Sequence, residues 1–252
     1  MPLLTSWLWL LLALLPLVFL ERWIHRHLQG LWLLLFHDSG VALVIYSVIM
    51  LPGVLLHEGS HWLAATVLGA RPARFSVIPE QMTDGTVRLG FVDTAKVDFV
   101  REALIGAAPL LFGSLTVILV AYGRLGVGPV GEALARGDLL AMTQGLGAIT
   151  RVPDFWLWLY FIFTVSNSML PSASDRRAWL PVALLLAALG GVLFYAGFGP
   201  VLVVTLTSPL DAAVRALAAA FTITVGLDLF FAPLLWLAER GIMRMTGLKV
   251  DY

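Results

Sequence analysis

The chain has 252 residues, of which 60% are hydrophobic and 13% charged, with a mean hydropathy of +0.91. About a quarter of the residues in a soluble domain are charged, so this composition excludes an ordinary soluble protein. The 16 basic and 16 acidic side chains cancel, which leaves no basic surface for nucleic-acid phosphates, and we expect no nucleic-acid partner. Because the chain has no cysteine, any metal ligands must come from His, Asp and Glu.

Six apolar runs organise the chain. A helix that crosses about 30 Å of hydrocarbon needs about 20 mainly apolar residues. Runs close to this length cover residues 3–20, 41–68, 103–122, 155–169, 179–198 and 216–237. The first run lacks the basic start and small-residue cleavage site of a signal peptide, so we expect it to be retained as a span. The sequence predicts an all-α polytopic membrane protein with about six transmembrane helices, in one membrane-embedded domain over residues 1–252.

The most polar stretch of the chain is residues 71–102, between the second and third apolar runs. Within it, residues 74–78 and 86–92 have the pattern of short strands around a Thr-Asp-Gly turn at residues 83–85. We therefore expect a short β-hairpin after the second apolar run. Residues 123–153 are glycine-rich and mildly polar, which predicts a loop with a short surface helix.

If all six runs cross the membrane, the polar segments fall on two sides. One side holds the N-terminus, residues 71–102, the turn at 175–177 and the C-terminus, and it carries ten of the 16 Lys and Arg residues. The basic residues of the other side are Arg22, Arg26, Arg124, Arg136, Arg151 and Arg215. Because Lys and Arg accumulate in cytoplasmic loops, the first side is predicted to be cytoplasmic.

The second apolar run contains His57-Glu58-Gly59-Ser60-His61, the HExxH pattern. On a helix, side chains four residues apart project from one face about 6 Å apart, so two imidazoles can bind one zinc ion. The metal makes water acidic enough to ionise near neutral pH, and the intervening glutamate is placed to take the proton. In a chain with five histidines, this pattern is expected by chance far less than once. The motif therefore predicts a zinc site with Glu58 as catalytic base.

These three ionisable residues lie within an apolar span, where such groups are costly unless they pair, bind a metal or meet water. An alternative is that they mark the end of a helix, with His57 and Glu58 reaching into the lipid headgroups. Headgroup contact accounts for the polar character but not for the spacing of the two histidines. Zinc ligation accounts for both.

Zinc in hydrolases usually has three protein ligands, so a third must come from elsewhere in the chain. The other histidines are His25, His27 and His37. They follow the first apolar run, on the opposite side from His61 in the six-span arrangement, and we interpret them as interfacial. Asp175 stands out because proline and serines interrupt the fourth apolar run at residues 167–175. The number of crossings places Asp175 and His61 on the same side, the predicted cytoplasmic one.

An HExxH motif in a membrane span, a polar hairpin after it, and a later span that ends in Asn, Pro and Asp resemble the site-2 protease family of intramembrane zinc metalloproteases. That family has a three-helix catalytic core. Its later motif is Asn-x-x-Pro-x-x-x-x-Asp-Gly, with the aspartate as third zinc ligand. The resemblance covers residues 41–178 as the protease core, with residues 1–40 as an extra N-terminal span and residues 179–252 as two extra C-terminal spans.

The resemblance implies that His57, His61 and Asp175 bind zinc and that Glu58 is the catalytic base. Asn167 and Asp175 keep the family's separation of eight residues. Zn²⁺ is the cofactor that these assignments imply.

Two positions depart from the family pattern. Pro171 falls one residue later than expected, and Arg176 replaces the glycine after the aspartate. In the third apolar run, Gly106 and Pro109 are similar to a Gly-Pro feature of the family's middle core helix. The resemblance thus implies supporting roles for Asn167, Pro171, Gly106 and Pro109.

Asp228 is a further acid, well inside the last apolar run. Acids within membrane spans tend to be functional, and a role near the metal or the substrate path is one interpretation. Because no motif surrounds it, we favour the other interpretation, a helix-packing contact with a Ser, Thr or Arg side chain.

The leading hypothesis is zinc-dependent hydrolysis of a peptide bond in a membrane-embedded or membrane-adjacent protein. Backbone amides of a helix in lipid are already hydrogen-bonded, so a substrate must unwind, and the predicted hairpin could offer it an open strand edge. One alternative is a membrane protein that binds zinc or a partner without hydrolysis, against which the presence of Glu58 argues. The other is a transporter, against which the concentration of polar residues at one point argues.

Overall fold

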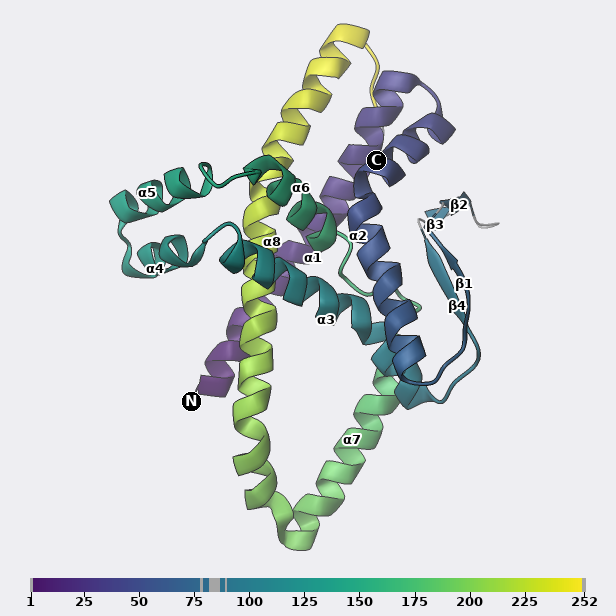
Figure 1. Ribbon diagram of the computed structural model, residues 1–252, viewed down its shortest axis with the longest axis vertical. Coiled ribbons are helices and arrows are strands. Elements are labelled where there is room, and N and C mark those ends of the chain that lie inside the picture. The colour runs from purple at the N-terminus through teal and green to yellow at the C-terminus, as the bar shows by residue number, and fades with distance from the viewer. Residues whose placement is uncertain (1, 78, 82–86, 89, 251–252) are drawn as a thin grey trace.

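The computed structural model describes residues 2–77, 79–81, 87–88 and 90–250, and these form a predominantly helical fold with a small β-region (Figure 1). The helices are α1 (Pro2–Phe36), α2 (Ser39–Val67), α3 (Phe99–Gly123), α4 (Gly128–Arg136), α5 (Leu139–Ile149), α6 (Phe155–Ser166), α7 (Trp179–Leu193), the π-helical η1 (Phe194–Phe198) and α8 (Gly199–Thr246). The predicted all-α class is confirmed for the described residues.

Within the described part of the chain, four helical segments are long and apolar enough to cross a membrane. They are Leu3–Phe36, Ser39–Val67, Phe99–Gly123 and Trp179–Thr246. The predicted count of six is not confirmed. Helix α6 has 12 residues, or about 18 Å at 1.5 Å per residue, which is less than the thickness of the hydrocarbon layer.

Helix α1 does not end at the charged residues after Leu20, as the sequence predicted, but continues to Phe36. Two polar residues of this part have partners on other helices: the His27 imidazole contacts the Glu239 carboxylate of α8, and Tyr46 of α2 bonds to His25. Because these contacts satisfy the polar groups inside the helix bundle, the helix has no need to stop there.

The last two predicted spans form one helical segment that reverses direction at Gly197. This glycine has a φ of 89°, a conformation that side chains with a Cβ atom rarely adopt. The turn lies at the lower end of the molecule in Figure 1, with α7 as one leg and the first part of α8 as the other. Helix α8 has 48 residues, about 72 Å, so it extends well beyond one bilayer thickness.

The predicted hairpin is confirmed in the described residues. Strand β1 (Pro72–Ser76) pairs antiparallel with β4 (Phe91–Thr94), with Phe75 opposite Val92, and β2 (Glu80–Gln81) pairs antiparallel with β3 (Val87–Arg88). The predicted second strand is thus divided between β3 and β4, while the predicted turn at residues 83–85 lies outside the described residues.

The predicted loop at residues 123–153 contains two short helices, α4 and α5, where one surface helix was expected. Asp138 caps the start of α5 by accepting a hydrogen bond from the Ala141 amide. Both helices extend to one side of the bundle (Figure 1).

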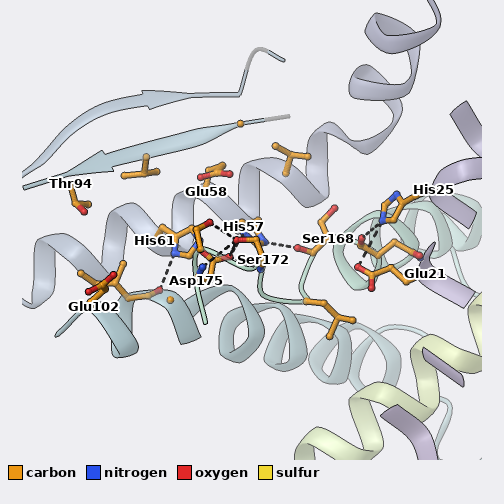
Figure 2. A pocket seen from close by; sticks show the side chains of 18 of the residues that line it. Glu21, His25, His57, Glu58, His61, Thr94, Glu102, Ser168, Ser172 and Asp175 are labelled. Atoms are coloured by element: carbon orange, nitrogen blue, oxygen red, sulfur yellow. Dashed lines mark hydrogen bonds and ion pairs between the residues drawn. The ribbon is translucent and has the colours of Figure 1, made fainter. Parts of the chain in front are cut away.

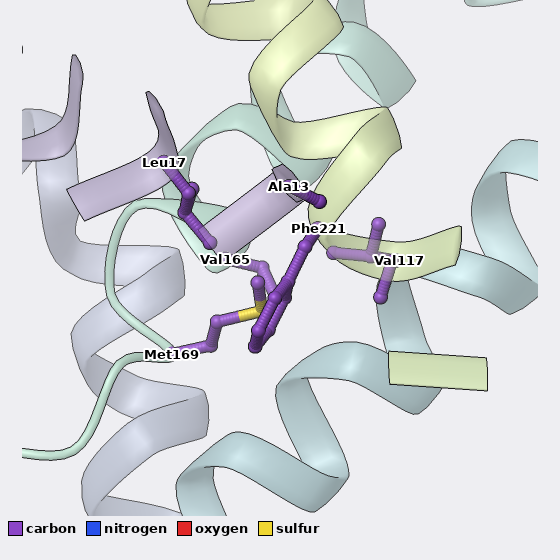
Figure 3. Packing of buried hydrophobic residues seen from close by; sticks show 7 residues of the cluster. Ala13, Leu17, Val117, Val165, Met169 and Phe221 are labelled. Atoms are coloured by element: carbon purple, nitrogen blue, oxygen red, sulfur yellow. The ribbon is translucent and has the colours of Figure 1, made fainter. Parts of the chain in front are cut away.

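A buried apolar cluster joins α1, α3, α6 and α8 (Figure 3). Its members are Ala13, Leu17, Val117, Val165, Met169, Ala220 and Phe221. The N-terminal segment and the C-terminal helix therefore pack directly onto the region predicted to be the protease core, and Met169 lies in the irregular segment that leads to Asp175.

Helix α2 approaches α6 closely at Gly53. A Cβ atom added to Gly53 would lie 2.0 Å from the Thr164 carbonyl oxygen and 2.5 Å from Ser168 Oγ. Only a glycine allows this approach, which places the HExxH helix against the end of α6.

We expect Gly53→Ala to destabilise the fold by about 1–3 kcal/mol, because α2 and α6 must separate to admit the methyl group. Thermal unfolding of the purified protein in detergent measures the effect. Gly241→Ala is the matched control: it lies in helix α8, and a Cβ atom there meets nothing within 4 Å. Equal unfolding temperatures for the two variants would contradict the close-packing argument.

Candidate metal centre

Helix α2 places His57 and His61 at one face. The His57 and His61 rings lie 4.9 Å apart between centroids, at an interplanar angle of 78°. His61 is buried, with 8% of its surface exposed, and His57 and Glu58 are half-buried. This is the arrangement that a spacing of four residues predicts on a helix.

Asp175 lies in the irregular segment between α6 and α7, where a local hydrogen-bond pattern fixes it. Its amide donates to Ser172 Oγ at 3.3 Å, while its own Oδ2 accepts from the Ser172 amide at 2.7 Å and from the Ser172 hydroxyl at 2.6 Å. This reciprocal pattern is a capping box, normally found at the start of a helix. Arg176 closes the same turn by donating from Nε to the Ser172 carbonyl oxygen.

The two imidazoles and the carboxylate converge (Figure 2). His61 Nε2 lies 3.3 Å from Asp175 Oδ1, His57 Nε2 lies 3.8 Å from Asp175 Oδ2, and one ligand atom from each residue falls within 4.8 Å of the others. Both pair distances exceed the roughly 2.8 Å of a charge-assisted hydrogen bond. They resemble the spacing of about 3.4 Å between ligand atoms around a tetrahedral zinc ion.

Hydrogen bonds orient both histidines for ligation. His57 Nδ1 bonds to the Ser168 carbonyl oxygen, and His61 Nδ1 bonds to the Ile105 carbonyl oxygen at 2.9 Å. A carbonyl oxygen only accepts, so each Nδ1 is the protonated nitrogen. In a neutral ring, Nε2 then presents a lone pair toward the Asp175 carboxylate. Such an arrangement of acceptors fits a cation between them, and the residues present therefore fit zinc.

The pKa of the Asp175 carboxyl lies well below its usual range. Burial raises this pKa, but the neighbouring imidazoles of His57 and His61 and the hydrogen bonds from Ser172 lower it by more. The carboxyl is therefore ionised at neutral pH, as a metal ligand must be.

Gly106 of α3 has a clear structural role beside this site. A Cβ atom added there would lie 2.0 Å from the Asp175 carbonyl oxygen, so α3 and the Asp175 segment are in direct backbone contact. Of the other predicted supporting residues, Asn167 lines the cavity around the site, whereas Pro109 and Pro171 do not. Pro109 is buried within α3, Pro171 lies in the irregular segment, and Asn167 is buried at the end of α6.

A cavity of about 720 Å³ surrounds the site. In Figure 2, Thr94 and Glu102 lie at one end, Glu21 and His25 at the other, and the ligand candidates between them. Val92 and Thr94 of β4 line the cavity, so the hairpin forms part of its wall. Its charged lining consists of acids and histidines, with no Lys or Arg among the described residues.

The prediction that His25 lies away from His61 is wrong, because both line this cavity. The error came from ending the first span at Leu20, whereas α1 continues and carries His25 into the bundle. Glu21, which lines the cavity as well, was also missed. A sequence signal existed: Glu21 and His25 are four residues apart, on one helix face.

The packing contact expected for Asp228 has a different partner. Its Oδ1 accepts a hydrogen bond from Asn167 Nδ2 at 2.9 Å, where a Ser, Thr or Arg contact was predicted. The roles of Ser168 and Ser172 at the site were also not predicted from the sequence. For Ser172, its spacing of three residues before Asp175 is the signal of a capping box.

No protein-family model, curated protein or solved structure matches this chain. The resemblance to the site-2 protease family therefore depends on its motif residues.

We expect Gly106→Ala to lower the zinc affinity of the purified protein about 10- to 100-fold, because the added methyl group displaces the Asp175 backbone. Metal affinity is measured by competition with a chelator. Gly123→Ala in the same helix is the control, since a Cβ atom there meets nothing within 4 Å. Unchanged affinity in Gly106→Ala would show that the position of Asp175 does not matter for metal binding.

Proposed function

We propose that this protein is an intramembrane zinc metalloprotease of the site-2 protease type, which hydrolyses peptide bonds of membrane-embedded or membrane-adjacent proteins. The observation that carries the proposal is the convergence of His57, His61 and Asp175, with Glu58 on the same cavity, in a chain of long apolar helices. A structural ion pair alone would not require a glutamate between the two histidines.

In this proposal His57, His61 and Asp175 hold the zinc ion. When bound, zinc would supply a Lewis acid that acidifies water and polarises the scissile carbonyl group. Glu58 accepts the proton of the attacking water and then donates it to the leaving amine. The hydrogen bonds from His57 and His61 to backbone carbonyl oxygens keep both rings oriented throughout.

The hairpin is the proposed substrate-positioning element. A transmembrane helix has its backbone amides hydrogen-bonded internally, so cleavage requires an unwound segment. Strand β4 pairs with β1 along one edge and contributes Val92 and Thr94 to the cavity wall. An extended substrate could therefore add to the hairpin beside the metal centre.

The proposal includes the cytoplasmic placement of the site. Its support is the excess of Lys and Arg in the segments predicted to share that side. The reversal at Gly197 is compatible with two of the six proposed crossings, since α7 and α8 run in opposite directions from it.

The proposal predicts different defects for the catalytic base and a ligand. Glu58→Gln should retain zinc but lose at least about 100-fold in cleavage rate, because the amide cannot accept the proton. His57→Ala and Asp175→Ala should lose both zinc and cleavage. Zinc content and the cleavage of a membrane-spanning peptide in detergent or liposomes are measured on the same preparations.

The outcomes separate the alternatives. Cleavage by Glu58→Gln at the wild-type rate would refute the mechanism, and full zinc occupancy in Asp175→Ala would refute the third ligand. A wild-type protein that binds zinc but cleaves no membrane peptide would be a binding module rather than a protease.

The role of the hairpin is tested by Val92→Pro, which removes one backbone N–H from β4. We expect slower cleavage of a membrane-spanning peptide, with zinc content unchanged. Val92→Ala is the control, because it shortens the side chain and keeps the backbone donor. If Val92→Pro cleaves at the wild-type rate with zinc bound, substrate addition to this strand is excluded.

A further inference from the structure

The segment just after α6 controls the orientation of one ligand candidate. His57 Nδ1 bonds to the Ser168 carbonyl oxygen, and Ser168 lies beyond the last residue of the helix. The position of this carbonyl oxygen therefore sets the direction in which His57 Nε2 points. Because Ser168 has left the helix, other contacts must hold its backbone in place.

Helix α8 provides one of these contacts through Asp228. Asn167 Nδ2 donates to Asp228 Oδ1 at 2.9 Å, and the two residues are 1% and 0% exposed, respectively. The same Nδ2 also donates to the Phe163 carbonyl oxygen at 3.0 Å. A buried acid in an apolar helix is costly unless it has a partner, and here the partner is the residue next to Ser168.

Helix α1 provides the second contact through His25. Its Nε2 donates to the Asn167 carbonyl oxygen at 2.8 Å, which makes Nδ1 the acceptor for the Tyr46 hydroxyl at 2.6 Å. Asn167 is thus held by its side chain from α8 and by its backbone from α1. Met169, the residue after Ser168, is buried in the apolar cluster between α1, α3 and α8 (Figure 3).

We infer that Asp228 and His25 are positioning residues of the metal centre, which hold Asn167 and thereby the Ser168 carbonyl oxygen that orients His57. This inference rests on the proposed zinc site. It assigns a function to α1 and α8, which lie outside the region predicted as the protease core. The competing explanation is that Asp228 contributes only to helix packing.

Asp211 offers a matched comparison for Asp228. It is also a buried acid of α8, 5% exposed, and it pairs with Ser6 at 2.6 Å and with Arg215 at 2.8 Å. It does not line the cavity. Loss of Asp211 therefore removes a buried acid and a contact between α1 and α8 without touching Asn167.

The experiment uses Co²⁺ as a probe, because its visible spectrum reports ligand geometry. Full-length variants in detergent are titrated with Co²⁺, and affinity and spectrum are compared. We expect Asp228→Leu and His25→Phe each to bind Co²⁺ about tenfold more weakly than wild type, with an altered spectrum. Asp228→Asn keeps an oxygen acceptor for Asn167 and should stay within about twofold of wild type, as should Asp211→Leu.

Wild-type affinity and spectrum in both Asp228→Leu and His25→Phe would overturn the inference. An equal loss in Asp211→Leu would overturn it as well, since any disturbance of α8 would then suffice. If Asp228→Leu does not fold, His25→Phe alone provides the test: wild-type Co²⁺ affinity and spectrum in this variant would overturn the inference. A wild-type protein that binds Co²⁺ but cleaves nothing refutes the protease and leaves this test intact, whereas one that binds no Co²⁺ refutes both.

Discussion

The cost of placing polar groups among apolar helices is the constraint on which this structure depends. A buried ionisable side chain without a partner destabilises a helix bundle strongly, so each must find a specific contact. Here the acids and histidines meet across helices: Asp211 with Ser6, His27 with Glu239, and Asp228 with Asn167. These pairings determine which helices lie side by side. They also fix the positions along α1 and α8 at which these helices contact their neighbours.

The same constraint explains why the chain can leave a helix beside the candidate metal centre. Helix α6 ends at Ser166, and the backbone that follows has polar groups that lipid could not satisfy. His25 and His57 donate to the carbonyl oxygens of Asn167 and Ser168, and the capping box satisfies the amides of Ser172 and Asp175. The irregular segment is therefore tolerated because these backbone groups have partners within the protein, and it brings a carboxylate to the two imidazoles.

Close backbone contacts complete the geometry. Gly53 brings α2 against α6, and Gly106 brings α3 against the Asp175 segment, each leaving no space for a Cβ atom. In lipid, helices gain little from hydrophobic association, so small residues that permit close approach contribute much of the packing energy. The positions of the two histidines and the aspartate thus depend on glycines as well as on polar contacts.

The sequence by itself determined the long apolar helices, the hairpin and the residues that converge at the site. It could do so because apolar length, strand alternation and a spacing of four on a helix are local properties. Tertiary structure decided where α1 ends, that His25 lines the cavity, that Gly197 reverses the chain, and that Asp228 meets Asn167. Apart from the reversal at Gly197, each of these depends on a partner distant in sequence. A charged residue ends a span only where no other helix supplies that partner, and one sequence does not record which helices meet.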